Sequence, residues 1–309
     1  MTTIGLWHVD GKLPNLALMK ISAWLKAQGH VTTLQRTPDE TTRYASVVFT
    51  RNRPQVEMWR RVYDFEAGGS GWDLAATLPS EIEEMVPDYD LYGINYAMGY
   101  LYRGCIRRCA FCLVPEKEGR LHRVQTLDRL VRQGSNRVML LDNNLTAAPD
   151  VLGILAEMAD RDLEVSFTQG LDIRLMTPEI AAAIARVKYR NNSFDGHKQL
   201  YFAFDNVRLE AQVRRGIDML LSAGIDPNTL SFYVLVGFNS TFSEDVRRCE
   251  VLRGYGIRPY VMRYRKTPEL NALARWANAN AGMWREPFAM YDGSRKRAKG
   301  ATSQLGLAL

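Results

Sequence analysis

The chain has 309 residues, which corresponds to about two average domains or to one barrel with an added segment. Hydrophobic residues make up 46% and charged residues 24%, a globular composition that excludes a disordered or fibrous chain. No stretch approaches the roughly 20 apolar residues of a membrane helix, and residues 1–30 lack a signal-peptide pattern, so we expect a cytoplasmic protein with no membrane partner. The net charge of +6 is too mild to indicate nucleic acid.

The first ninety residues predict alternating strands and helices, which together form a small Rossmann-like β-α layer domain over 1–90. The glycine-rich stretch Gly68–Gly71 predicts a loop. The expected strands are 4–9, 31–34 and 44–50, the expected helices are 15–27 and 79–85, and 58–65 is expected to be a helix or a strand.

From residue 91 onward, single helices alternate with short apolar runs. Six such units predict a parallel sheet that curls, so the expected fold class is α/β with a partial (β/α)6 TIM-like barrel over 91–266. Thr177 before Pro178, and Thr241 or Ser243 before Glu244, predict helix N-termini. The expected strands are 91–97, 137–141, 163–168, 199–205, 230–236 and 257–264, and the expected helices are 124–133, 148–160, 178–188, 208–223 and 242–253, with another after Pro268.

Residues 267–309 predict a C-terminal helical extension with a basic tail. Trp276 and Trp284 precede the basic segment Arg295–Lys299, and aromatic rings beside cations can bind nucleic acid. The favoured interpretation is a helix that closes the open barrel edge, with buried aromatic rings and a cationic tail.

The informative motif is a cluster of three cysteines directly after the first expected barrel strand. Cys105, Cys109 and Cys112 have the spacing C-x-x-x-C-x-x-C, and three thiolates in such a loop can bind one face of an iron–sulfur cluster. The fourth cysteine, Cys249, lies in an expected helix and is interpreted as a buried apolar residue. A zinc site with His122 as the fourth ligand is the weaker alternative.

The cysteine spacing, with Phe111 before the last cysteine, resembles the motif of the radical S-adenosylmethionine (SAM) superfamily. The resemblance implies a [4Fe–4S] cluster whose open iron binds the amino and carboxylate groups of SAM. It also implies reductive cleavage of SAM to a 5′-deoxyadenosyl radical that abstracts hydrogen from a substrate, and a full or partial α/β barrel. Phe111 would lie beside the adenine.

The strand ends supply the other candidate SAM contacts, because ligands of such barrels lie over the carboxyl ends of the strands. The resemblance places the amino group of SAM at the end of the second strand and its carboxylate near Arg174. A glycine at the end of the fifth strand, Gly237, would line the adenine. The candidates are Asp142, Asn143, Asn144, Gln169, Asp172, Arg174, Asp205, Val236 and Gly237.

The N-terminal segments Pro14–Ser22, Gly29–His30 and Gly68–Gly71 resemble the truncated cobalamin-binding-like domain of one radical SAM branch. The usual cobalt-ligand motif is missing, since the first loop reads His8-Val9-Asp10-Gly11. Cobalamin is therefore possible but not favoured, and we expect this domain to act as a lid.

The sequence thus predicts a radical SAM enzyme whose substrate, a nucleotide, nucleic acid or peptide, is not identified. No cysteine precedes Cys105, so a second cysteine-ligated cluster and sulfur insertion are not expected. A flavodoxin or ferredoxin is the expected reductant. The alternatives are a cobalamin-dependent radical SAM methyltransferase and a non-enzymatic Fe–S or zinc module that binds nucleic acid.

Overall fold

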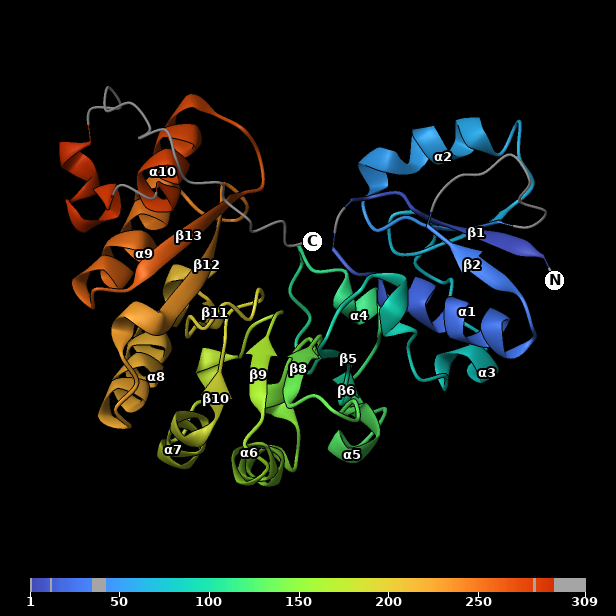
Figure 1. The fold of residues 1–309 in the computed structure, drawn as a ribbon. Helices are drawn as coiled ribbons and strands as arrows, with labels where there is room; N and C mark the ends of the chain where they lie inside the picture. Colours follow the sequence, from blue (N-terminus) through green and yellow to red (C-terminus); the bar gives the residue numbers. More distant parts are fainter. Residues whose placement is uncertain (1, 12, 35–42, 280–281, 292–309) are drawn as a thin grey trace. The chain divides into compact units, whose positions relative to one another are not determined.

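The computed structural model describes residues 2–11, 13–34, 43–279 and 282–291. The chain divides into two compact units (Figure 1). Of the described residues, the first unit contains those between 2 and 99 and between 112 and 119, and the second contains those between 100 and 111 and between 120 and 291. The division falls at Gly99, whereas the sequence predicts a boundary at residue 90.

The first unit is built on a parallel sheet of four strands in the order β2-β1-β3-β4. Alternate residues of β1 enter two separate cores: Ile4 and Leu6 pack with residues of α1, while Trp7 packs with Val56 and Trp59 of α2. This alternation is what the pleat of a strand requires when both faces are covered. The elements are β1 (Thr3–His8), α1 (Leu16–Ala27), β2 (Val31–Thr33), β3 (Arg43–Ser46), α2 (Arg53–Trp59), β4 (Glu66–Gly68) and α3 (Ser80–Glu83).

Several sequence predictions in the first unit were wrong. Residues 58–65, expected to be a helix or a strand, contain only the last two residues of α2 and no strand residue. The strand expected over 44–50 ends at Ser46, because the amides of Val48 and Phe49 donate to the carboxylate of Asp10 instead of to a neighbouring strand. The loop expected at Gly68–Gly71 begins one residue later, since Gly68 is the last residue of β4.

The second sheet has the order β10-β9-β8-β5, and the third has the order β11-β12-β13. Pairing is parallel between β8, β9 and β10 and throughout the third sheet. In Figure 1, α6 to α9 run along the outer side of these strands. The loop after β9 reaches the third sheet through a hydrogen bond from the Leu171 amide to the Tyr201 carbonyl (2.8 Å).

The strands are β5 (Ala97–Gly99), β8 (Arg137–Leu140), β9 (Glu164–Phe167), β10 (Lys188–Tyr189), β11 (Leu200–Ala203), β12 (Leu230–Val236) and β13 (Arg258–Arg263). The helices are α4 (Val114–Lys117), α5 (Leu127–Leu130), α6 (Val151–Asp160), α7 (Pro178–Arg186), α8 (Glu210–Ser222), α9 (Phe242–Gly254) and α10 (Pro268–Asn278). A short antiparallel pair, β6 (Tyr102–Arg103) with β7 (His122–Arg123), flanks the cysteine segment.

The expected α/β class with parallel strands is confirmed, as are the strands at 137, 163, 199, 230 and 257 and the helices that follow them. The strand expected over 91–97 was wrong, since residues 89–91 form a 3-10 turn and the strand begins at Ala97. Trp276 is fully buried, as the favoured interpretation of the C-terminal aromatics requires, whereas Arg295–Lys299 lies outside the described residues. Among the described helices, none has the length and apolarity to cross a membrane.

One glycine in α8 allows a close helix contact. A Cβ atom on Gly216 would lie 2.6 Å from both the Cγ1 atom and the carbonyl oxygen of Ile173. Glycine is a poor helix former, so a helix-interior glycine is retained here because it lets α8 approach the loop after β9. Gly153 in α6, by contrast, has open space at the same position.

We predict that Gly216→Ala lowers the free energy of unfolding by about 1–3 kcal/mol, because overpacking outweighs the gain in helix propensity. The matched variant Gly153→Ala should raise it by about 0.5–1 kcal/mol. Urea denaturation of the two variants measures both values. A stabilising Gly216→Ala variant would contradict the close contact.

Candidate active site

A buried carboxylate, that of Asp142, binds the backbone just before the cysteine loop. Asp142, two residues after the end of β8, accepts hydrogen bonds from the amides of Leu101 (3.0 Å) and Tyr102 (2.7 Å). Burial raises the pKa of Asp142 to about 7, although both amide bonds oppose that rise. The end of β8 therefore fixes the backbone that leads into the loop.

The next two residues extend this attachment to the loop itself. Asn143 accepts a hydrogen bond from the amide of Gly104 (3.2 Å), and the amide nitrogen of the Asn144 side chain lies 3.5 Å from the sulfur of Cys105. Gly104 has a φ of +78°, which favours glycine at this tight turn. The sequence predicts that Asp142, Asn143 and Asn144 contact SAM; that role stays a prediction, and their contacts with the cysteine loop were not foreseen.

Asn144 also carries a polar atom without a partner. The residue is 3% exposed, its Nδ2 atom lies 3.3 Å from Asp172 Oδ2, and its Oδ1 atom has no hydrogen-bond partner. A buried carbonyl oxygen in this state is costly unless a donor reaches it. The geometry therefore leaves one acceptor available for a ligand beside Cys105.

Two arginines hold Asp172, in the loop after β9. Arg107 Nε donates to Asp172 Oδ2 (3.0 Å), and Arg174 donates to both carboxylate oxygens (2.5 and 2.9 Å). Burial would raise the pKa of Asp172, but these hydrogen bonds and charges outweigh it and hold the pKa below its usual value. Arg107 belongs to the cysteine loop, so this ion pair joins the loop to the end of β9.

The same group of charges surrounds Cys109. Burial raises the pKa of its thiol, the charges of Asp205 and Cys105 add to the rise, and Arg174 opposes it through its charge and a hydrogen bond. Asp205, directly after Phe204, accepts a hydrogen bond from the Leu235 amide (2.9 Å). Cys109 is therefore within electrostatic reach of Cys105, Arg174 and Asp205, while the predicted roles of these residues toward a cluster and SAM stay predictions.

Phe111 meets the end of β12 through an aromatic contact. Its ring lies edge-on to Phe238 with a centroid distance of 5.6 Å, and Phe238 packs against Tyr264 at 4.8 Å. Phe238 was not predicted as a site residue, although it directly follows Gly237. The one feature of the sequence that could have indicated Phe238 is its position directly after a glycine at a strand end.

Gly237 has a reason within the chain for being glycine. Its φ is +73°, and a Cβ atom would lie 2.5 Å from Leu270 of α10. Val236 is fully buried, so only its backbone is available near a ligand. The predicted adenine contacts of Val236 and Gly237 therefore stay predictions that concern backbone atoms.

A buried ion pair on α9 fixes the carboxyl ends of β11 and β12. Arg248 is fully buried and donates to the carbonyls of Phe204 (2.6 Å) and Leu235 (2.9 Å). Its partner Asp245 accepts from the amide of Gly237 (3.0 Å). Helical spacing alone gives no signal for this pair, because both charges would be assigned to an exposed helix face.

Gln169 and Cys249 lie in environments that differ from those of the candidates above. Gln169 is exposed. Cys249 is fully buried in α9, and burial raises the pKa of its thiol to about 12, so it stays protonated at neutral pH. Thr241 is the N-cap of α9 and forms a capping box with Glu244, which confirms that helix start.

A polar pocket of about 280 Å³ adjoins the ends of β11 and β12, lined by Asn206, Val207, Arg208, Asn239, Ser240 and Glu244.

The glycine loop of the first unit packs closely against the backbone of the segment that follows β3. A Cβ atom on Gly69 would lie 2.4 Å from the Val47 carbonyl oxygen, and one on Gly71 would lie 2.5 Å from the Phe49 carbonyl carbon. Both glycines therefore allow close packing on the segment after β3.

His8, in the first unit, lies 3.2 Å from the Tyr92 hydroxyl, and burial lowers the pKa of His8.

The donor set fits a cysteine-ligated cluster in its chemistry. Three thiols lie within eight residues of the sequence; Arg174 hydrogen-bonds to Cys109, and the side-chain nitrogen of Asn144, whose oxygen lacks a partner, lies 3.5 Å from the sulfur of Cys105. No three histidine, cysteine or acidic side chains of the described residues are positioned to hold a metal ion. Neither the protein-family models nor the curated proteins compared with the chain match it.

The raised pKa of Asp142 predicts a pH-dependent stability. A folded-state pKa near 7, above the usual 3.8, means that the folded chain binds the proton more tightly, so this stabilisation is full below pH 4 and is lost as the pH rises toward 7. Between pH 4 and 7 the wild type should lose about 3 kcal/mol of unfolding free energy relative to Asp142→Asn. Urea titrations at several pH values test this, and parallel pH profiles of the two proteins would contradict it.

Proposed function

We propose that this chain is a radical SAM enzyme. The observation that carries the proposal is the cysteine loop itself: it is attached at Leu101, Tyr102 and Gly104 to the side chains that end β8. Such attachment is needed where a loop must keep several thiolates on one inorganic cluster.

Cys105, Cys109 and Cys112 would hold a [4Fe–4S] cluster. With one iron open to SAM, such a cluster and an electron from a flavodoxin or ferredoxin supply reductive cleavage to methionine and a 5′-deoxyadenosyl radical, which abstracts hydrogen from the substrate. Cys249 would take no part, because its thiol is buried and protonated at neutral pH.

The residues around the loop are suited to bind SAM itself. The free oxygen of Asn144 can accept a hydrogen bond from the amino group, and Arg174 can pair with the carboxylate. Arg174 already pairs with Asp172, so SAM would share this arginine with that acid. Phe111 and the backbone at Gly237 would border the adenine, and Asp205 would bind a ribose hydroxyl.

The second and third sheets would together form the wall of a partial (β/α)6 barrel. Their parallel strands, the outer helices and the hydrogen bond between Leu171 and Tyr201 support this arrangement. The candidate residues then share the carboxyl edge of the strands, where barrel enzymes bind ligands.

The packing of Gly69 and Gly71 on their own strand supports a structural role for the glycine loop, so cobalamin is not part of the proposal. Trp276 lies in the core and donates to the Glu286 carbonyl, so it offers no surface for a nucleic-acid base. The substrate class is taken up below.

The cysteine assignment predicts that Cys109→Ala abolishes cluster content, because the loop supplies three thiolate ligands and the variant leaves only two to hold the cluster. Cys249→Ala serves as the matched control and should retain the full content of iron and sulfide. Both proteins are reconstituted anaerobically, and iron, sulfide and deoxyadenosine release with SAM and dithionite are measured.

Four retained iron atoms in Cys109→Ala would overturn the assignment. Zinc in place of iron and sulfide would point to the structural alternative. Stoichiometric corrin bands after incubation with hydroxocobalamin would move the function toward radical methylation.

Arg174→Ala should weaken SAM binding to the cluster-loaded protein by a few kcal/mol at most, the scale of a lost charged hydrogen-bonded pair. Arg186→Ala removes an exposed arginine that pairs with Asp160 on a neighbouring helix and should leave the affinity unchanged. Calorimetry measures both. Equal affinities of the two variants would remove Arg174 from the SAM site.

A further inference from the structure

One face of the β11-β12-β13 sheet carries three tyrosines, and its neighbouring positions open to solvent. The parallel register pairs Ala203 with Tyr233 and Tyr233 with Tyr260, so these side chains share a face. Ala203 is exposed and Tyr260 is half-buried. We call this surface the tyrosine face; its residues are Tyr201, Ala203, Tyr233, Leu235, Tyr260 and Met262, and the same register continues the face beside Tyr201 with Ser231 and Arg258.

The opposite face of the same sheet is closed. Phe202, Phe232 and Val234 are each at most 1% exposed, and the rings of Phe202 and Phe232 stack at 5.2 Å. The tyrosine face is less closed, since Ala203 is exposed and Tyr260 and Met262 are half-buried, although Tyr201, Tyr233 and Leu235 are buried.

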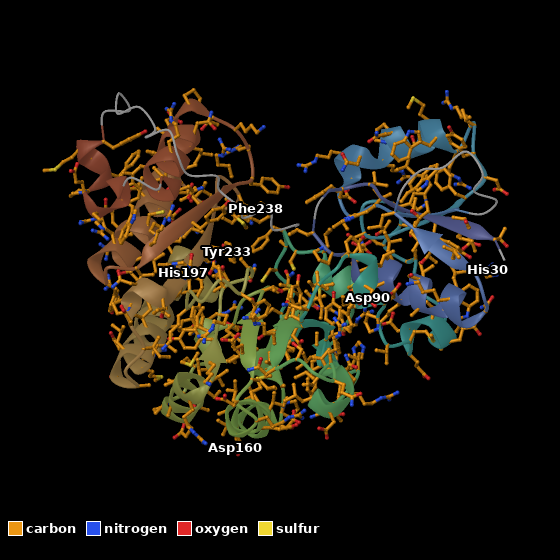
Figure 2. All side chains as sticks on the ribbon, viewed as in Figure 1. His30, Asp90, Asp160, His197, Tyr233 and Phe238 are labelled. Atoms are coloured by element: carbon orange, nitrogen blue, oxygen red, sulfur yellow. The ribbon has the colours of Figure 1, made fainter. Side chains whose placement is uncertain are left out.

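Tyr233 is fixed within this face by its neighbours. Its ring lies parallel to Tyr201 at 5.7 Å and edge-on to Tyr260 at 5.7 Å. Two ring contacts leave the side chain little freedom to rotate, so its hydroxyl has a defined direction. Figure 2 shows Tyr233 on β12, with Phe238 beyond the carboxyl end of that strand.

The hydroxyl of Tyr233 has no hydrogen-bond partner, although the residue is only 9% exposed. A buried hydroxyl normally finds a partner, and an unpaired one is destabilising. Burial raises the pKa of Tyr233, so the hydroxyl keeps its proton at neutral pH and can donate.

The tyrosine face also leads to the cysteine loop. Along β11 the residues of this face are Tyr201 and Ala203, and the next on the same side is Asp205, which influences Cys109 electrostatically. A molecule on the tyrosine face would therefore lie along the row that ends at the candidate active site.

We propose that Tyr233 is a substrate-binding residue whose hydroxyl donates a hydrogen bond to a carbonyl oxygen of a molecule with an apolar or aromatic body. The body would contact the apolar side chains of Ala203, Leu235 and Met262. This inference deepens the proposed function and rests on it only in calling the bound molecule a substrate; the binding itself needs neither cluster nor SAM.

The test uses the full chain, labelled with 13C at the tyrosine Cζ position, and two probes: benzamide, a ring with a carbonyl, and toluene, a ring without an acceptor. We expect benzamide to shift the Tyr233 signal, which is assigned by its loss in Tyr233→Phe. That variant should bind benzamide roughly three- to tenfold more weakly, the effect of one net hydrogen bond, and toluene with unchanged affinity.

Tyr189→Phe is the matched control, because the Tyr189 hydroxyl lies 3.3 Å from Thr229 Oγ1. It should keep the affinity for benzamide and have a lower Tm. Tyr233→Phe should have an unchanged or higher Tm, since the hydroxyl that it loses has no partner in the free protein. A lower Tm for Tyr233→Phe would indicate a structural role instead.

Equal benzamide affinity of the wild type and Tyr233→Phe would overturn the proposal. So would the absence of any shift of the Tyr233 signal at roughly 10 mM benzamide, a concentration at which fragments of this size bind a preformed site. Failure to load a cluster, with the benzamide result intact, would overturn the proposed function and leave the tyrosine site standing.

Discussion

The arrangement of the candidate site depends on a carboxylate that is taken out of water. Asp142 is 4% exposed and accepts from two consecutive backbone amides, which fixes the direction in which the chain leaves Tyr102. Gly104 and Cys105 are then within reach of the next two side chains of the same turn. A carboxylate in this position is retained at the cost of desolvation, which its raised pKa reflects.

Much of the fold is predictable because its signals are local. The helices α7 and α9 begin where an N-cap threonine precedes a proline or an acid, and the strands of the third sheet coincide with short apolar runs. The strand prediction over 91–97 failed because an apolar residue at its start packs against the core without forming a strand. Leu91, the first residue of the strand expected over 91–97, ends a 3-10 turn and packs against the core of the first unit, so its hydrophobicity reflects packing rather than a strand.

The site is predictable only in part, for a related reason. The rule that ligands lie at strand ends selects Asp142, Asn144 and Arg174 as SAM contacts, and that role stays a prediction; the structure shows that all three lie next to the cysteine loop. It cannot supply their partners, because Arg107 meets Asp172 across 65 positions of the sequence. Such a contact follows from the register of the sheets and leaves no local pattern.

The ion pair of α9 has a consequence for how the chain can change during evolution. Arg248 and Asp245 hold the ends of two strands from behind and are fully enclosed, so almost any replacement there leaves an unpaired buried charge. The side chains of the tyrosine face lie on the other side of the same strands and take no part in that support. Under the proposed function, these side chains can therefore be exchanged, and with them the molecule that binds, without a change in the ion pair that supports the strands.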